Sequence, residues 1–321
     1  LPRPGRPVVR RNIRTWGKRD CNRKMTRLSW FSLFLAPERG SGRKQDMNRM
    51  IGGPLAAMLA LSACASTVRE QIYRADAAPV QVAQWTKTAP VALPVRSEDG
   101  LALSGYYWPG DPADRDVILF FHGRGSHQGI GARYAEHLAG KGDHVVVVSY
   151  RGFGGNPGTP TQAGLVADGR SFVTAARDLV GPDARLFLVG HSLGGAVALH
   201  VAATVKVAGV VTLSTFDKLE ESAPGGVGLL LPDKWNNLDA VTKIGAPLVM
   251  IQGTADDRVD MAQADALFAA ARAPAAMLTV PGAGHNPDMT QLGPMVSAAI
   301  GAIDSGAMAG YPATLPAGWR V

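Results

Sequence analysis

Cysteine is scarce in this chain, and its distribution argues against a disulfide-stabilised fold. The 321 residues include two cysteines, Cys21 and Cys64. Because we expect Cys21 to be absent from the mature protein, no disulfide is predicted. No group of His, Cys and Asp residues has the spacing of a metal site, and the adjacent acids Asp256 and Asp257 do not make one alone. We therefore expect neither a metal nor another cofactor.

The positive charge of the chain comes from its first 46 residues. Residues 1–46 hold 13 Lys and Arg against three acids, and no apolar periodicity organises them. Such a segment cannot bury enough surface to offset its chain entropy. The whole chain has a formal charge of +7, so the remaining residues sum to −3. Since no basic stripe interleaved with aromatics follows, we expect no nucleic-acid partner.

Residues 47–63 have the composition of an export signal. Met47 and the single charge of Arg49 precede the apolar run Ile51–Leu61, and small residues come before a polar stretch. The run is shorter than the ~20 residues of a helix that spans a bilayer. We therefore expect translation to begin at Met47, so that residues 1–46 are an untranslated or disordered upstream extension.

The signal ends in a motif similar to the bacterial lipobox. Residues 61–64 read LSAC, and the resemblance implies that Cys64 is acylated and becomes the mature N-terminus. This predicts a lipoprotein anchored to a membrane of the bacterial cell envelope, facing outside the cytoplasm. Residues 64–90 would be a tether with a short helix around Val68–Ala75. The open alternative is that Cys64 is a small apolar residue of a signal or uncleaved anchor.

From residue 91 onwards, strand and helix patterns alternate. Val91–Val95 and Leu101–Tyr107 flank turn residues and predict an antiparallel hairpin. The later apolar runs have the length of strands buried on both faces: Val117–Phe121, Val145–Ser149, Leu186–Val189, Val207–Leu213, Pro247–Ile251 and Ala276–Val280. Helical stretches lie between them: Gly131–Ala139, Gln162–Leu179, Leu193–Thr204, Ala262–Ala271 and one near Gln291–Ile303.

This alternation predicts one α/β domain over residues 91–305, with a mostly parallel, doubly wound sheet. Residues 217–245 interrupt the pattern with Pro, Gly and an apolar leucine run, which indicates a short lid insertion. Residues 306–321 are expected to be a C-terminal tail.

A nucleophile elbow is predicted at residues 190–194, which read GHSLG. The motif follows an apolar strand and precedes a helix, so a tight turn would expose the hydroxyl of Ser192 at the sheet edge. Glycine at positions 190 and 194 gives the turn the space that it needs. The alternative is a glycine-rich turn of a nucleotide-binding fold.

A serine nucleophile needs a base and an acid that orients the base. In elbow hydrolases these follow the serine in the order Asp or Glu, then His. His285 is the histidine that lies after Ser192 at a strand end. The acid is Asp256 or Asp257, in the loop after the preceding strand. The other histidines are His122, His127, His137, His144, His191 and His200.

Acyl transfer also needs hydrogen-bond donors for the developing oxyanion. The backbone N–H of Leu193, directly after the nucleophile, supplies one. The glycine-rich loop FHGRG at residues 121–125 occupies the place of the second, and we assign it to the N–H of Arg124. His122 is interpreted as a residue that hydrogen-bonds within this loop.

These motifs together resemble the α/β-hydrolase family over residues 91–300. Residues 150–155 (YRGFGG) are similar to a loop of the branch that includes serine peptidases, acylglycerol lipases and protein depalmitoylases, with Asn156 in place of its usual serine. The sequence NNL at residues 236–238 also resembles that branch. The resemblance implies an α/β-hydrolase fold and favours Asp256 as the acid.

The predicted function is hydrolysis of an acyl ester by a carboxylesterase, lipase or thioesterase-like enzyme. The expected substrate is a small-molecule or lipid-like acyl ester, because Val227 and Leu229–Leu231 would form an apolar lid. Alternatively, these leucines pack the insertion onto the sheet. Two other functions stay open, a serine peptidase or amidase and a catalytically silent binding protein of the envelope.

Overall fold

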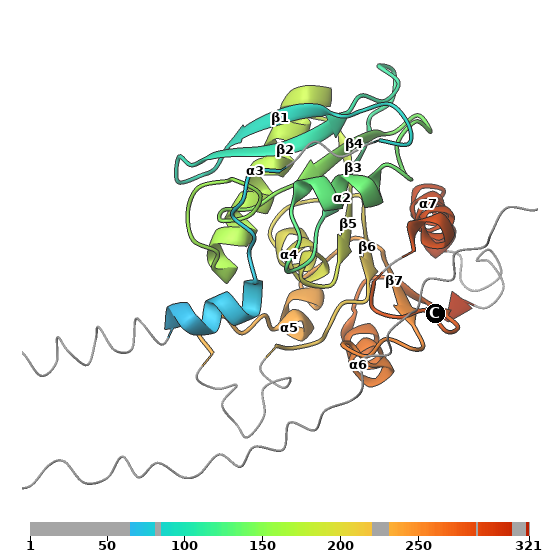
Figure 1. Cartoon of the computed structure of the whole chain (residues 1–321). Helices are drawn as coiled ribbons and strands as arrows, with labels where there is room; N and C mark the ends of the chain where they lie inside the picture. The colour runs from blue at the N-terminus through green and yellow to red at the C-terminus, as the bar shows by residue number, and fades with distance from the viewer. Residues whose placement is uncertain (1–64, 81–84, 220–230, 287, 310–318, 321) are drawn as a thin grey trace, which may run out of the picture. The chain divides into compact units, whose positions relative to one another are not determined.

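The computed structural model describes residues 65–80, 85–219, 231–286, 288–309 and 319–320. These residues form a nine-stranded sheet in the order β1-β2-β4-β3-β5-β6-β7-β8-β9, flanked by helices (Figure 1). The strands are β1 (Val91–Arg96), β2 (Ala102–Trp108), β3 (Asp116–Phe121), β4 (His144–Val148), β5 (Arg185–His191), β6 (Gly209–Leu213), β7 (Leu248–Gly253), β8 (Ala275–Val280) and β9 (Trp319–Arg320).

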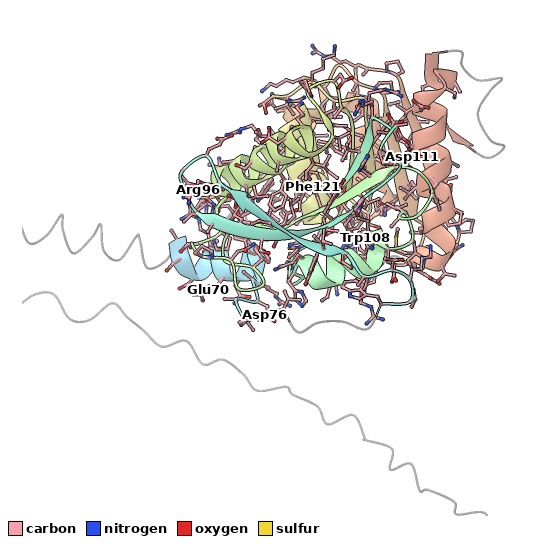
Figure 2. The ribbon with its side chains drawn as sticks, turned by 90° about the horizontal axis from the view of Figure 1, so that it is seen from above. Glu70, Asp76, Arg96, Trp108, Asp111 and Phe121 are labelled. Carbon is pink, nitrogen blue, oxygen red and sulfur yellow. The ribbon has the colours of Figure 1, made fainter. Side chains whose placement is uncertain are left out.

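The pairing of the strands confirms the predicted mostly parallel, doubly wound sheet. Strands β4, β3, β5, β6, β7 and β8 run parallel, while β2 pairs antiparallel with β4 and β9 pairs antiparallel with β8. The expected hairpin of β1 and β2 runs across the top of the fold, with Arg96 near its tip and Trp108 at its open end (Figure 2).

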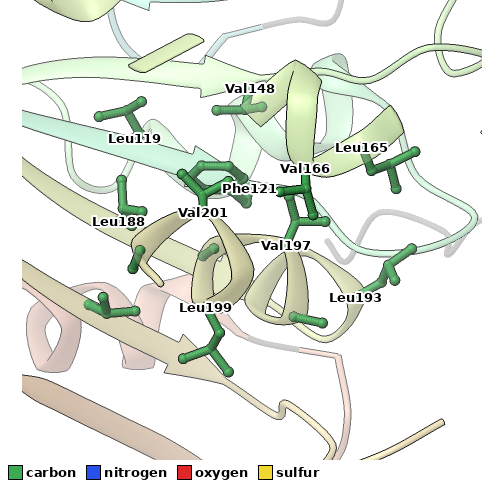
Figure 3. Packing of buried hydrophobic residues seen from close by; sticks show 14 of the residues in the cluster. Leu119, Phe121, Val148, Leu165, Val166, Leu188, Leu193, Val197, Leu199 and Val201 are labelled. Carbon is green, nitrogen blue, oxygen red and sulfur yellow. The ribbon is translucent and has the colours of Figure 1, made fainter. Parts of the chain in front are cut away.

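Helices cover both faces of the sheet, which explains why its strands are apolar throughout. Along β3, Leu119 and Phe121 contact one hydrophobic cluster, while Ile118 and Phe120 contact the other. The first cluster includes residues of α3 (Gln162–Val180), α4 (Leu193–Ala202), α5 (Asn237–Val241) and α6 (Met261–Ala270). Figure 3 shows α4 packed over the strands in this cluster. The second includes residues of α2 (Gln128–Ala135) and α7 (Met289–Asp304).

The strand order has a switch point between β3 and β5. After β3 the chain crosses to β4 on one side, and it then returns to β5 on the other side of β3. At such a point the loops that leave the carboxyl ends of neighbouring strands diverge and leave a crevice for a ligand. The loop after β3 and the turn after β5 both lie at this edge.

The short helix expected near the start of the tether is present over residues 65–73, and it packs on the domain, which was not expected (blue in Figure 1). Tyr73 is fully buried, and its hydroxyl accepts a hydrogen bond from Nε1 of Trp235 at 3.3 Å. Arg69 pairs with the buried carboxylate of Asp233 at 2.8 Å. The anchoring partners are more than 160 positions away, so local sequence gave no sign of this docking.

The predicted tail also contributes to the fold. Met308 is buried in the 3₁₀ helix η3 (Ala307–Ala309), and β9 extends the sheet beyond β8. Within the predicted lid, Leu231 packs partly buried against the core. Residues 220–230 lie outside the described residues, as do residues 1–64 with Cys64, so the lid, the signal and the anchor stay predictions.

Candidate active site

Ser192 occupies a strained turn between β5 and α4. Its backbone has φ +53° and ψ −119°, a region that residues with a side chain rarely adopt. The turn closes so tightly that a Cβ on Gly190 would lie 2.5 Å from the backbone oxygen of Gly194. A Cβ on Gly194 would in turn collide with the backbone of Phe121. The predicted elbow is therefore present, and its glycines are required by contact.

Three of the predicted residues are joined by hydrogen bonds. Nε2 of His285 lies 3.0 Å from Oγ of Ser192, and Nδ1 of the same ring lies 3.0 Å from both carboxylate oxygens of Asp256. All three side chains come from turns at the carboxyl ends of β5, β7 and β8. In this arrangement Nδ1 donates to the carboxylate, which leaves Nε2 able to accept the proton of the serine hydroxyl.

Asp256 is held in its ionised form. Burial alone would raise the pKa of this carboxyl, but the backbone N–H groups of Val259 and Arg258 and the ring of His285 hold the pKa below its usual value. The two N–H groups donate to Oδ1 at 3.0 and 2.9 Å. Asp257 is exposed, so the geometry resolves the choice between the two adjacent acids in favour of Asp256 as the partner of His285.

Two further residues support this group, and sequence reasoning did not single them out. His191 Nε2 donates to the backbone oxygen of His285 at 2.9 Å, and burial lowers the pKa of His191 to about 4, which keeps its ring neutral. Gln252 Nε2 donates to the backbone oxygen of Val259 at 2.8 Å and also lies 3.3 Å from Oδ2 of Asp256. His191 reaches a loop 94 positions away, which no local motif reveals, whereas Gln252 braces the loop that directly follows it.

The two predicted oxyanion donors lie on the same cavity as Ser192. Leu193 begins α4, so its N–H has no acceptor within that helix. Among the described residues, no backbone oxygen accepts a hydrogen bond from the N–H of Arg124. His122 is fully buried beside them; its Nδ1 donates to the backbone oxygen of Gly123 at 3.0 Å, and burial lowers its pKa to about 4. This agrees with its interpretation as a residue that bonds within the loop.

The cavity beside Ser192 has a volume of about 730 Å³. One part of its wall is apolar and the rest carries positive charge. Its lining consists of Ile72, Arg74, Arg124, Gly125, Ser192, Leu193, Phe216, Leu219, Arg258, Val259 and His285. Among the described residues, no group of three or more His, Cys, Asp or Glu is placed to hold a metal ion, and no helix has the length and hydropathy to cross a membrane.

Fold and site together define an α/β hydrolase with a serine at its elbow, and comparison with known proteins agrees. A family model described as serine aminopeptidase, S33 matches residues 112–237. An uncharacterized protein of Mycobacterium tuberculosis is 33% identical over 250 residues, which cover 73% of this chain and 88% of that protein. Human alpha/beta hydrolase domain-containing protein 17B is 26% identical over 222 residues, covering 68% and 77%.

A solved structure shows the same fold. An esterase from Pyrococcus furiosus matches with a TM-score of 0.57 at 19% identity, over 71% of this chain and 97% of that one. The chain therefore belongs to the α/β-hydrolase family of serine hydrolases.

The elbow glycine gives a direct test of the packing. Gly194→Ala should lower the free energy of unfolding by about 2–3 kcal/mol, because its Cβ meets backbone that cannot rotate away. Gly301→Ala is the matched control, since Gly301 is exposed in α7 with nothing within 4 Å of its Cβ. It should raise stability by about 0.5–1 kcal/mol. Urea unfolding of both variants checks this, and equal stabilities would contradict the contact.

Proposed function

We propose that this protein hydrolyses acyl esters through an acyl-enzyme intermediate on Ser192. The observation that carries the proposal is the hydrogen-bonded series from Ser192 through His285 to Asp256, in which Ser192 and His285 line a cavity. A carboxylesterase, lipase or thioesterase reaction uses this arrangement in the same way.

In the first half-reaction, Ser192 Oγ attacks the carbonyl carbon of the ester while its proton passes to Nε2 of His285. Asp256 stabilises the imidazolium that results. The tetrahedral intermediate then collapses: the carbon–oxygen bond to the alcohol breaks, and the alcohol leaves with the proton from His285. In the second half, His285 takes a proton from a water molecule whose oxygen attacks the acyl carbon. The bond between that carbon and Oγ of Ser192 then breaks, Oγ takes the proton from His285, and the carboxylic acid leaves.

The oxyanion of each tetrahedral intermediate would be bound by the N–H groups of Leu193 and Arg124. Leu193 is buried at the start of α4, so its N–H would need no reorganisation when the charge develops. A donor of this kind contributes about 10²–10³ in rate.

The charge of the cavity favours esters over the amino-terminal substrates of an aminopeptidase. An aminopeptidase must hold a free ammonium group, for which a carboxylate is the natural partner. Apart from the serine and histidine, the polar side chains on the described lining are Arg74, Arg124 and Arg258. Three guanidinium groups repel an ammonium, so peptidase or amidase activity on free N-termini is the weaker candidate.

The apolar part of the wall supports a substrate with an acyl chain. Ile72, Phe216, Leu219 and Val259 lie on the cavity together with Leu193, and burial of each methylene against such a wall stabilises binding by up to ~0.8 kcal/mol. We therefore propose a preference for medium acyl chains over acetyl.

The proposed location is the surface of an envelope membrane, through a lipid on Cys64. The helix over residues 65–73 follows Cys64 directly and carries Ile72, which lines the cavity. Nine helical residues span ~14 Å. A lipid at that position would hold the cavity close to the bilayer, which suits a lipid-like acyl substrate.

The nucleophile is tested with Ser192→Ala in the full-length chain. We expect kcat/KM for nitrophenyl esters from acetyl to palmitoyl to fall at least about a thousand-fold, with loss of fluorophosphonate labelling and an unchanged melting curve. Ser305→Ala, at an exposed serine beyond α7, is the control and should keep both the ester hydrolysis and the fluorophosphonate labelling. Labelling that persists without Ser192 would refute the assignment.

The acid is tested with a matched pair of neighbours. Asp256→Asn should reduce kcat by about 10³–10⁴, because the imidazole loses its orienting charge and adopts the wrong tautomer. Asp257→Asn removes an equal charge one residue away and should change kcat less than about threefold. If the two variants exchange effects, Asp257 is the acid.

The anchor is tested by intact-mass analysis of the protein from its native cells. The expected mature chain begins at Cys64 with acyl chains attached, and Cys64→Ala should accumulate as unprocessed precursor. An unmodified Cys64, or a mature N-terminus upstream of Met47, would overturn the lipoprotein assignment.

A further inference from the structure

Three arginines from separate segments meet at the cavity beside Ser192. Arg74 follows the helix over residues 65–73, Arg124 lies in the loop after β3, and Arg258 lies in the loop after β7. Their side chains are on residues exposed to solvent, yet all three line the same space as Ser192. A ligand on the nucleophile would therefore lie within reach of this arginine rim, by which we mean Arg74, Arg124 and Arg258.

The arginine rim has no acidic partner among the described residues. Elsewhere in the described chain, arginines that form ion pairs do so with nearby carboxylates: Arg69, Arg115, Arg151, Arg170 and Arg185. The rim residues make no such pair. Burial lowers the pKa of Arg124, and the positive charges of Arg74 and Arg258 lower it further. The three guanidinium groups therefore repel one another. A negative group placed among them would relieve this repulsion.

We propose that the substrate carries a carboxylate or phosphate close to its scissile acyl ester and that Arg74, Arg124 and Arg258 bind this group. The inference rests on the proposed esterase function and adds a substrate class to it. A guanidinium presents its donors in a planar fork that matches both anions. The apolar wall of Ile72, Phe216 and neighbouring residues would receive the uncharged part, so the substrate is an amphipathic, anionic ester.

Pairs of soluble esters that differ in charge test the proposal with the full-length protein. On the acyl side, the 4-nitrophenyl monoester of adipate is compared with 4-nitrophenyl hexanoate. On the alcohol side, 4-butanoyloxybenzoate is compared with its methyl ester. The measured quantity is the ratio of kcat/KM between the anionic and neutral member of each pair. We expect a ratio above about ten for at least one pair, which identifies the side that carries the charge.

The variants are Arg74→Gln and Arg258→Gln, singly and combined; Arg124 is left intact because its backbone serves the proposed oxyanion site. The ratio for the preferred pair should fall about threefold to tenfold in each single variant and further in the double. Arg272→Gln, at an exposed arginine that is not part of the cavity lining, is the matched control and should leave the ratio unchanged. Melting curves verify that every variant is folded.

Ionic strength provides a second readout that a structural role of the arginines would not produce. Raising salt from 0.01 to 0.5 M should lower the wild-type ratio of kcat/KM between the anionic and the neutral ester. The ratio of the double variant should change little, because salt screens the charges that this variant lacks. Hydrolysis of both members of each pair at equal kcat/KM would overturn this inference and leave the esterase proposal intact. Absence of hydrolysis for every ester would overturn both.

Discussion

The site depends on one backbone constraint, the left-handed conformation of Ser192 between β5 and α4. A φ of +53° at a residue with a side chain is unfavourable by ~1–3 kcal/mol and persists only where surrounding structure enforces it. Here the enforcement comes from the close approach of Gly190 and Gly194 to each other and to the end of β3. The same contact places the turn against the loop that carries Arg124, the proposed second oxyanion donor.

Electrostatics then determine which groups at the edge carry charge. Asp256 is buried, but two backbone N–H groups compensate for its desolvation and hold it ionised. For His191 and His122, one backbone hydrogen bond each offsets only part of the desolvation, and burial keeps their rings neutral. His285 alone among these three histidines contacts both a carboxylate and a hydroxyl. The three imidazoles therefore differ in their partners: His122 and His191 bond to backbone oxygens, and His285 bonds to a carboxylate and a hydroxyl.

Local patterns predicted the parts of this protein that are encoded in contiguous residues. The parallel strands, the elbow and the order of Ser192, Asp256 and His285 follow from short motifs between apolar runs. The docking of the helix over residues 65–73 and the strand β9 did not, because their partners lie far along the chain. The bracing bond of His191 to His285 spans 94 positions and was missed for the same reason.

The arginine rim shows most clearly why a substrate class is harder to infer than a mechanism. The triad chemistry needs specific residue types in a fixed order, which a motif records. The rim draws one residue from each of three segments, and one of these, Arg74, belongs to a part of the chain expected to be a tether. That segment contributes both Ile72 to the apolar wall and Arg74 to the charged rim. If Cys64 is acylated, the residues that attach the protein to a membrane are therefore continuous with those that shape its substrate cavity.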